Sequence, residues 1–207
     1  MMFSETTLKK LREDVASLMS HKRYLHTLGV ESMAVYLGEC CGIADISELH
    51  AAALLHDVSK DFSQSEQISF LIEEGITLTE EESESPKIWH SYTAPHVIKR
   101  DFPDFATDNV LSAVYNHTLG APDMSLFDEI IFLADFIEEG REYPSCIATR
   151  NYVLNNMKRG QTEHNVNTLH KASLMEIDAT LESLLSKNKS INSKTILTKE
   201  SLICKIY

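Results

Sequence analysis

The stretch Leu54-Leu55-His56-Asp57-Val58-Ser59-Lys60 places a histidine and an aspartate side by side in an apolar segment that follows three alanines. Burying two polar side chains there is costly unless each finds a partner, and a metal ion would supply one. If the helix continues through this stretch, Lys60 lies one turn after His56 and projects toward whatever the metal holds. The pair becomes informative only if further metal-ligating side chains occupy similar positions.

Further histidines and an aspartate do lie on apolar helical faces. Apolar residues recur at helical spacing along most of the chain, and His26 shares its face with Val30 and Ala34. Asp135 closes the wholly apolar run 130–134. Any one of these residues alone is best explained as a satisfied core residue, but together they favour a dinuclear metal site. The six candidate ligands are His26, His56, Asp57, His90, His117 and Asp135.

The same patterning predicts an all-α fold, because no segment shows sustained two-residue alternation and no Asn-Gly or Asp-Gly hairpin turn occurs. Capping-box patterns at 45–48, 63–66 and 125–128 mark three helix starts. We expect a single helical bundle over residues 1–187 with the metal centre in its core. Residues 188–207 are rich in Ser, Lys and Asn, and we expect a loosely ordered tail or an addition to the domain.

Composition narrows the class of partner. The net charge of −12 and the lack of a long basic run argue against nucleic acid. The four cysteines have no paired spacing, which suits free thiols in a reducing cytosol. No segment approaches the roughly 20 apolar residues that a membrane span needs. We therefore expect a cytoplasmic protein that binds neither nucleic acid nor membrane; a homodimer is left open.

Five segments carry a resemblance to a known family: KRYLHTLGV at 22–30, ALLHD at 53–57 with Lys60-Asp61, WHSY at 89–92, NHT at 116–118 with Gly120, and IFLADFIE at 131–138 with Gly140-Arg141. On these segments the chain resembles the HD-domain superfamily of metal-dependent phosphohydrolases, and more closely the bacterial symmetrical diadenosine tetraphosphate hydrolases. It departs at Glu139, where relatives usually have proline, and at 191–195, which keep only part of the usual ending. The resemblance implies a hydrolase with an HD-domain helical bundle.

Asp57 is the candidate bridge between two divalent ions. A histidine-rich ligand set suits transition metals such as iron or manganese better than magnesium or calcium, and the resemblance favours iron. Two such ions would leave the centre positively charged, and a hydroxide bridging them would attack phosphorus. The ligands would divide into His26, His56 and Asp135 for one ion and His90 and His117 for the other.

Other residues are candidates for holding the substrate. Asp57, Lys60 and Arg141 are assigned to catalysis, with Lys60 and Arg141 also holding phosphates; the alternative for these two cations is a surface salt bridge. Thr118 would donate its hydroxyl to a phosphate or cap the turn. His96 is a further candidate for the substrate cleft. Glu138 would hydrogen-bond a ligand histidine or pair with Arg141.

Three functions follow from this pattern. The first is hydrolysis of diadenosine tetraphosphate to two ADP, with a dinucleoside polyphosphate or nucleotide as partner. The second is a di-iron oxygenase, because some HD-domain oxygenases share the same ligand order. The third is a nucleotide-binding regulatory module without catalysis, which would not need to retain all six ligands.

Overall fold

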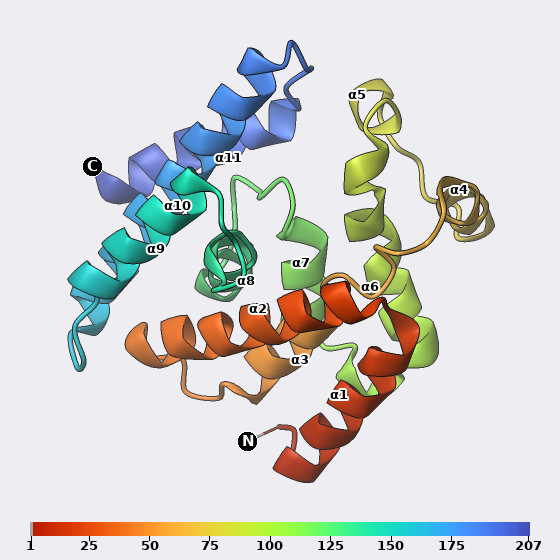
Figure 1. Cartoon of the computed structure of the whole chain (residues 1–207), viewed down its shortest axis with the longest axis horizontal. Coiled ribbons are helices and arrows are strands. Elements are labelled where there is room, and N and C mark those ends of the chain that lie inside the picture. Colours follow the sequence, from red (N-terminus) through yellow and green to blue (C-terminus); the bar gives the residue numbers. More distant parts are fainter. Residues whose placement is uncertain (1) are drawn as a thin grey trace.

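The computed structural model describes residues 2–207, and this part of the chain contains helices and short loops but no β-strand (Figure 1). The all-α prediction is therefore confirmed. No helix in residues 2–207 combines the length and apolar character needed to cross a membrane. The α-helices are α1 (Glu5–Leu18), α2 (His21–Cys40), α3 (Ser47–Leu55), α4 (Gln64–Glu73), α5 (Glu80–Ser83), α6 (Trp89–Asp101), α7 (Asp108–Asn116), α8 (Leu126–Ile137), α9 (Pro144–Asn156), α10 (Thr162–Ser186) and α11 (Ser193–Ile206), with 3-10 turns at Pro86–Ile88 and Pro103–Phe105.

Helix α2 packs against both α3 and α8, and these three helices form the middle of the molecule (Figure 1). Leu49 and the whole run 51–55 of α3 are fully buried. Gly38 allows the close approach of α2, because a Cβ atom there would lie 2.3 Å from Leu49 Cδ1. The residues 130–134 of α8 are also buried. Close packing of this kind holds the helices that bear the candidate ligands in fixed positions.

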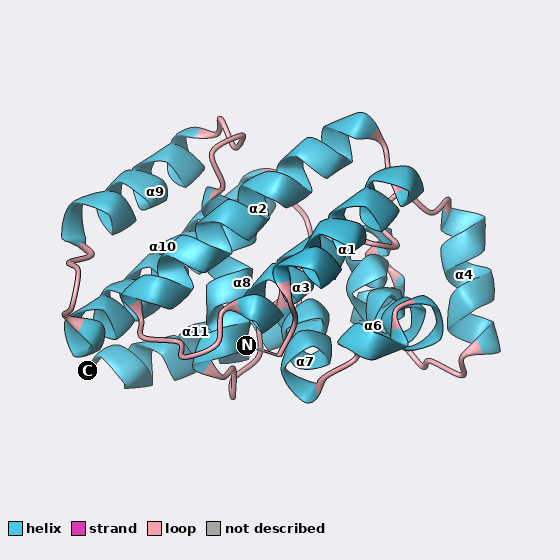
Figure 2. Ribbon diagram, turned by 90° about the horizontal axis from the view of Figure 1, so that it is seen from below, coloured by secondary structure: helices cyan, strands magenta, loops and turns pink. Residues whose placement is uncertain are grey.

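The outer helices occupy the two ends of the molecule. Helix α4 lies at one end, while α9 and the C-terminal end of the chain lie at the other (Figure 2). Helix α6 connects the α4 end to the middle, since it packs on both α4 and α7.

Two of the three expected capping boxes are present. Ser63 with Glu66 caps α4, and Ser125 with Asp128 caps α8. The capping box at 45–48 was wrong: α3 begins at Ser47, and its N-cap residue Ile46 has no side-chain cap. Asp45 instead accepts the backbone N–H of Ser47 at 3.0 Å, a local turn that competes with the cap.

The helix does not continue past His56, so the condition under which Lys60 would lie one helical turn after His56 is not met. Helix α3 ends at Leu55, and residues 56–62 form turns in which the Lys60 N–H donates to Asp57 O at 2.9 Å. Successive residues on a helix point in different directions. Leaving the helix here lets His56 and Asp57 face the same interior.

The sequence left residues 188–207 as either a loosely ordered tail or an addition to the domain. In the structure, residues 193–206 of this segment form a helix that packs on the rest of the protein. Helix α11 lies along α10, and Leu202 is buried in a small apolar cluster with Ile177, Leu181 and Phe132. Lys205 Nζ donates to Met124 O at 2.9 Å. The end of the chain is thus joined to α10 and to the start of α8.

This packing predicts that two leucines of α11 contribute unequally to the free energy of unfolding. Leu202 is 1% exposed and Leu197 is 50% exposed. Leu202→Ala should lower the free energy of unfolding by about 2–5 kcal/mol, because it empties a buried site. Leu197→Ala should change it by less than about 0.5 kcal/mol. Urea denaturation followed by circular dichroism measures both, and equal effects would show that α11 is not packed on α10.

Candidate metal centre

The fold brings the six candidate ligands together from five separate places in the chain. They form three overlapping groups of three residues. Within each group, one nitrogen or carboxylate oxygen from every residue lies within 4.8 Å of those of the other two. All of them are buried or partly buried. The ligands are His26 on α2, His56 and Asp57 in the turn after α3, His90 on α6, His117 at the end of α7, and Asp135 on α8.

Asp57 lies in the middle of this cluster. Its Oδ2 atom is 3.7 Å from Nε2 of His26 and 3.4 Å from Nε2 of His56. Its Oδ1 atom is 3.2 Å from Nε2 of His90 and 3.7 Å from Nε2 of His117. The two carboxylate oxygens therefore face two different pairs of histidines, the arrangement that a bridging ligand needs.

The imidazole rings present their Nε2 atoms to the centre. Nδ1 of His56 lies 2.6 Å from Ala53 O, and Nδ1 of His117 lies 2.6 Å from Val114 O. Carbonyl oxygens only accept, so Nδ1 carries the proton and the Nε2 lone pair is free, as in metal-binding histidines. His26 makes the equivalent contact, 3.1 Å from Nδ1 to Glu138 Oε1. Glu138 thus contacts a candidate ligand histidine, and it also lies 3.9 Å from Arg141 Nε, so both contacts considered for it are present.

Two buried ring nitrogens of this cluster, Nε2 of His26 and Nε2 of His56, make no hydrogen bond of normal geometry within residues 2–207. Each instead faces a carboxylate oxygen, Asp135 Oδ1 at 3.0 Å from His26 and Asp57 Oδ2 at 3.4 Å from His56. Buried polar atoms are almost always paired, so each unpaired one needs an explanation. The donor set of four histidines and two aspartates fits divalent transition metals, and the unpaired nitrogens are what a ligand set for such ions would show.

The charge states of the carboxylates suit metal binding. Burial raises the pKa of Asp57, but the surrounding histidines, His56 foremost, outweigh it and hold that pKa well below its usual value. The same balance, with His26 and Arg141 as the opposing groups, lowers the pKa of Asp135. Burial and the nearby Lys60 lower the pKa of His90. The aspartates are thus ionised and His90 is neutral, the forms that coordinate metal.

His26 differs from His90 because two carboxylates flank it. Burial lowers the pKa of His26, but its contacts with Asp135 and Glu138 outweigh burial and raise the pKa to about 9. Its Nε2 lies 3.0 Å from Asp135 Oδ1. A bound cation would take the place of this proton between the same groups.

Lys60 and Thr118 lie on the His90 side of the centre. Lys60 Nζ is 3.0 and 3.1 Å from the two ring nitrogens of His90, and it donates to Lys87 O at 3.1 Å. Burial lowers the pKa of Lys60. Thr118 Oγ1 is 3.1 Å from Nε2 of His117 and 3.2 Å from Nε2 of His90. Both side chains are placed to contact a molecule bound at the centre.

Arg141 lies on the opposite side, and the structure adds an arginine that the sequence analysis missed. Arg141 Nη2 is 2.6 Å from Asp135 Oδ1. Arg23 Nη1 is 2.6 Å from Asp57 Oδ2, and its Nε is 3.8 Å from Asp61 Oδ1. Arg23 stands three residues before His26, so helical spacing puts the two on one face. That spacing was the signal that could have identified it.

The structure does not bring His96 to the centre. Its Nδ1 lies 3.0 Å from Glu74 Oε2, and its described hydrogen bonds and ion pairs involve none of the six candidate ligands. His90 faces inward, whereas His96, six residues later on α6, faces α4. Six positions is not a helical repeat, and this difference accounts for the opposite directions.

The contacts of Gly29 explain why the segment 22–30 has a glycine at this position. A Cβ atom at this position would lie 2.3 Å from Glu138 Oε2. The same Oε2 accepts the N–H of Gly140 at 2.6 Å. The missing side chain of Gly29 therefore gives Glu138 room to reach His26.

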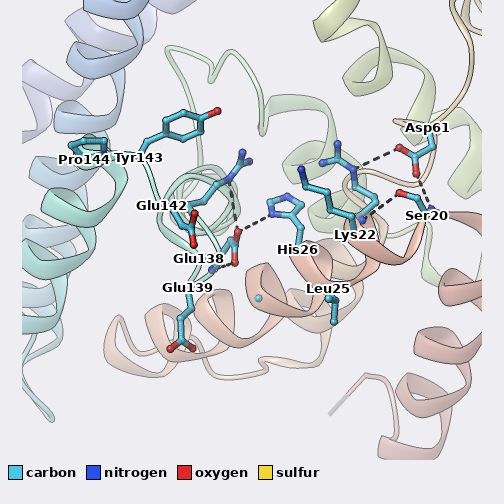
Figure 3. A pocket seen from close by; sticks show the side chains of 14 residues that line it. Ser20, Lys22, Leu25, His26, Asp61, Glu138, Glu139, Glu142, Tyr143 and Pro144 are labelled. Carbon is cyan, nitrogen blue, oxygen red and sulfur yellow. Dashed lines mark hydrogen bonds and ion pairs between the residues drawn. The ribbon is translucent and has the colours of Figure 1, made fainter.

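A pocket of about 1060 Å³ opens beside His26 (Figure 3). We call it the His26 pocket. Its walls come from the start of α2, with Lys22 and Arg23, and from the loop 138–144, with Arg141 and Tyr143. In Figure 3, His26 lies between Lys22 and Asp61 on one side and Glu142 and Tyr143 on the other. The pocket gives a small molecule access to this side of the centre.

Comparison with known proteins identifies the family. The family model described as the HD domain matches residues 23–140, the segment that contains all six candidate ligands. The chain belongs to the HD-domain family. Curated relatives agree with this HD-domain assignment and with the resemblance drawn from the sequence.

Two curated relatives and one solved structure align with nearly the whole chain. The symmetrical bis(5'-nucleosyl)-tetraphosphatase of Bacillus subtilis is 29% identical over 91% of this chain and 94% of its own length. The enzyme of the same name from Halalkalibacterium halodurans is 30% identical over 89% and 91%. A Clostridium acetobutylicum crystal structure, described as a predicted HD superfamily hydrolase involved in NAD metabolism, has 28% identity and a TM-score of 0.82 over 99% of this chain and 100% of that one.

The position of Asp57 predicts that substituting it lowers the metal content more than substituting one of the histidines does. Asp57→Ala should abolish binding of both ions, because each of its oxygens faces one pair of histidines. His90→Ala should remove only one ion per chain. Metal content after dialysis, measured by inductively coupled plasma mass spectrometry, gives the ratios, and His164→Ala, a histidine outside the cluster, is the control. A full metal complement in Asp57→Ala would contradict the bridging arrangement.

The contact between Glu138 and His26 predicts that substituting Glu138 weakens metal binding. Glu138→Gln should weaken metal binding about 10- to 100-fold, the usual effect of removing a group that orients a ligand histidine. Gly29→Ala should act in the same direction, since its Cβ displaces the Glu138 carboxylate. Competition with a chelating dye measures the affinity, and Glu139→Gln, an exposed neighbour, is the matched control. Equal affinities for the 138 and 139 variants would remove Glu138 from the site.

Proposed function

We propose that this protein hydrolyses diadenosine tetraphosphate symmetrically to two ADP, with two divalent transition-metal ions, iron being the preferred metal. The observation that supports this most strongly is the cluster of six candidate ligands, in which the two oxygens of Asp57 face the four histidines. The names of the Bacillus and Halalkalibacterium relatives, both symmetrical tetraphosphatases, point to the same substrate. The substrate is a small molecule, and we expect the reaction to take place in the cytoplasm.

Three cations support a polyphosphate substrate in a protein of net charge −12. Arg23 and Arg141 reach the centre from the His26 pocket, and Lys60 reaches it from the His90 side. Arginine forms paired hydrogen bonds to phosphate oxygens, and lysine acts as a point charge. With cations on both sides, a chain of phosphates can lie across the centre.

The remaining roles follow from position. Two bound ions would supply an activated water and neutralise the charge of the phosphoryl oxygens. Thr118 has its hydroxyl at the centre and can donate to a phosphate oxygen. Glu138 holds the His26 ring in place. We leave His96 out of the substrate site because it is engaged by Glu74.

The same cations distinguish the proposed function from the alternatives. A di-iron oxygenase could use the six ligands equally well, but it has no general need for two arginines and a lysine around them. A regulatory nucleotide-binding module would need the cations but not the full ligand set. The combination of ligands and cations favours phosphate-ester hydrolysis.

The direct test is product analysis under exclusion of oxygen. The metal-loaded protein should convert each diadenosine tetraphosphate into two ADP, seen by anion-exchange chromatography, at the same rate with and without oxygen. His56→Ala should lose activity at least about 10³-fold because a ligand is removed, while His164→Ala should retain it. ATP and AMP as products would contradict symmetrical cleavage, and a requirement for oxygen would support the oxygenase.

A further inference from the structure

We propose that the outer end of the His26 pocket, formed by Tyr143 with Glu142, binds one nucleoside of the substrate and makes the site prefer nucleotides over inorganic polyphosphates. This inference rests on the proposed function and assigns one half of the substrate to a place in the structure. It follows from how charge and aromatic surface are distributed in the pocket.

The inner end of the pocket, next to the candidate metal centre, is the end at which Arg23 and Arg141 lie. Arg23 and Arg141 each lie 2.6 Å from a candidate ligand carboxylate, that of Asp57 and that of Asp135 respectively. Phosphates that contact both the centre and these guanidinium groups therefore lie at this end. The rest of a bound nucleotide must extend away from the centre, along the pocket.

Tyr143 lines the pocket on the side toward which the rest of the nucleotide would extend. It follows Arg141 by two residues, so their Cα atoms are at most about 7 Å apart. The Tyr143 side chain lines the pocket, is 69% exposed, and has no hydrogen-bond or ion-pair partner within residues 2–207. An aromatic face that is free and bordered by cations is the usual platform on which a base stacks.

The backbone restrains this tyrosine despite its exposure. Tyr143 is the N-cap residue of α9, and Pro144 follows at the first helical position. Proline restricts the residue before it to extended conformations, and Tyr143 has φ −66° and ψ 139°. Fixing the backbone in advance reduces the entropy lost when a base stacks.

An acidic residue, Glu142, completes the outer end beside Tyr143 (Figure 3). It lines the pocket and is exposed, and its carboxylate has no hydrogen-bond or ion-pair partner among the described residues. This charge repels phosphate, but its oxygens can accept hydrogen bonds from ribose hydroxyls. The pocket thus has cations at its inner end and acceptors with an aromatic ring at its outer end, which matches the polarity of a nucleotide.

The test compares ADP with inorganic pyrophosphate, which has the same number of phosphates and no nucleoside. Isothermal titration calorimetry on the metal-loaded protein measures both affinities. Tyr143→Ala should weaken ADP binding about tenfold, the size of one stacking interaction, and leave pyrophosphate binding unchanged. Tyr143→Phe should bind ADP like the wild type, because it keeps the ring. Tyr207→Ala, which removes a tyrosine that is 97% exposed, is the matched control.

The kinetic readout should agree. Tyr143→Ala should raise KM for diadenosine tetraphosphate about tenfold with kcat unchanged, because the change lies away from the reacting phosphates. The inference is overturned if Tyr143→Ala binds ADP normally, if it weakens ADP and pyrophosphate equally, or if Tyr143→Phe behaves like Tyr143→Ala. ADP binding needs no turnover, so these outcomes are separate from hydrolysis by the wild type, which tests the proposed function.

Discussion

The ionised carboxylate of Asp57, buried among four histidines, is the interaction on which the rest of the site depends. A buried charge of this kind is strongly unfavourable unless cations or hydrogen bonds surround it. The fold brings α2, α6, α7 and α8 to the turn after α3, and each of them contributes a candidate ligand to the same cluster. The tight packing of α2 on α3 and α8, with Gly38 and the alanine run at the contact, keeps these positions fixed.

An acidic protein can bind a polyanion because its positive charge is concentrated at this centre. Two divalent ions would outweigh the two aspartates, and Arg23, Lys60 and Arg141 extend the positive region on both sides. Most of the remaining carboxylates lie on the surface, where solvent and salt screen their charge. Net charge alone is therefore a poor guide to the partner, and the local distribution decides.

The sequence singled out the six residues that the fold brings together, because each one follows or interrupts an apolar helical segment, a signal that does not depend on tertiary structure. Their role as metal ligands stays a prediction. The sequence predicted less where tertiary contacts decide. Lys60 would follow His56 by one turn only on a continuing helix, but the chain turns after Leu55 and the lysine contacts His90. Arg23 was not singled out, because its contact with Asp57 depends on how α2 packs against the turn after α3. Composition left residues 188–207 as either a loosely ordered tail or an addition to the domain, whereas α11 packs on its neighbours through the buried residues Thr195, Thr198 and Leu202.

We propose that Asp57 bridges two metal ions, and anomalous X-ray diffraction from metal-loaded crystals is the direct test. We expect two anomalous peaks, one contacted by His26, His56 and Asp135 and the other by His90 and His117, with one oxygen of Asp57 on each. A single peak, or two peaks without Asp57 between them, would contradict it.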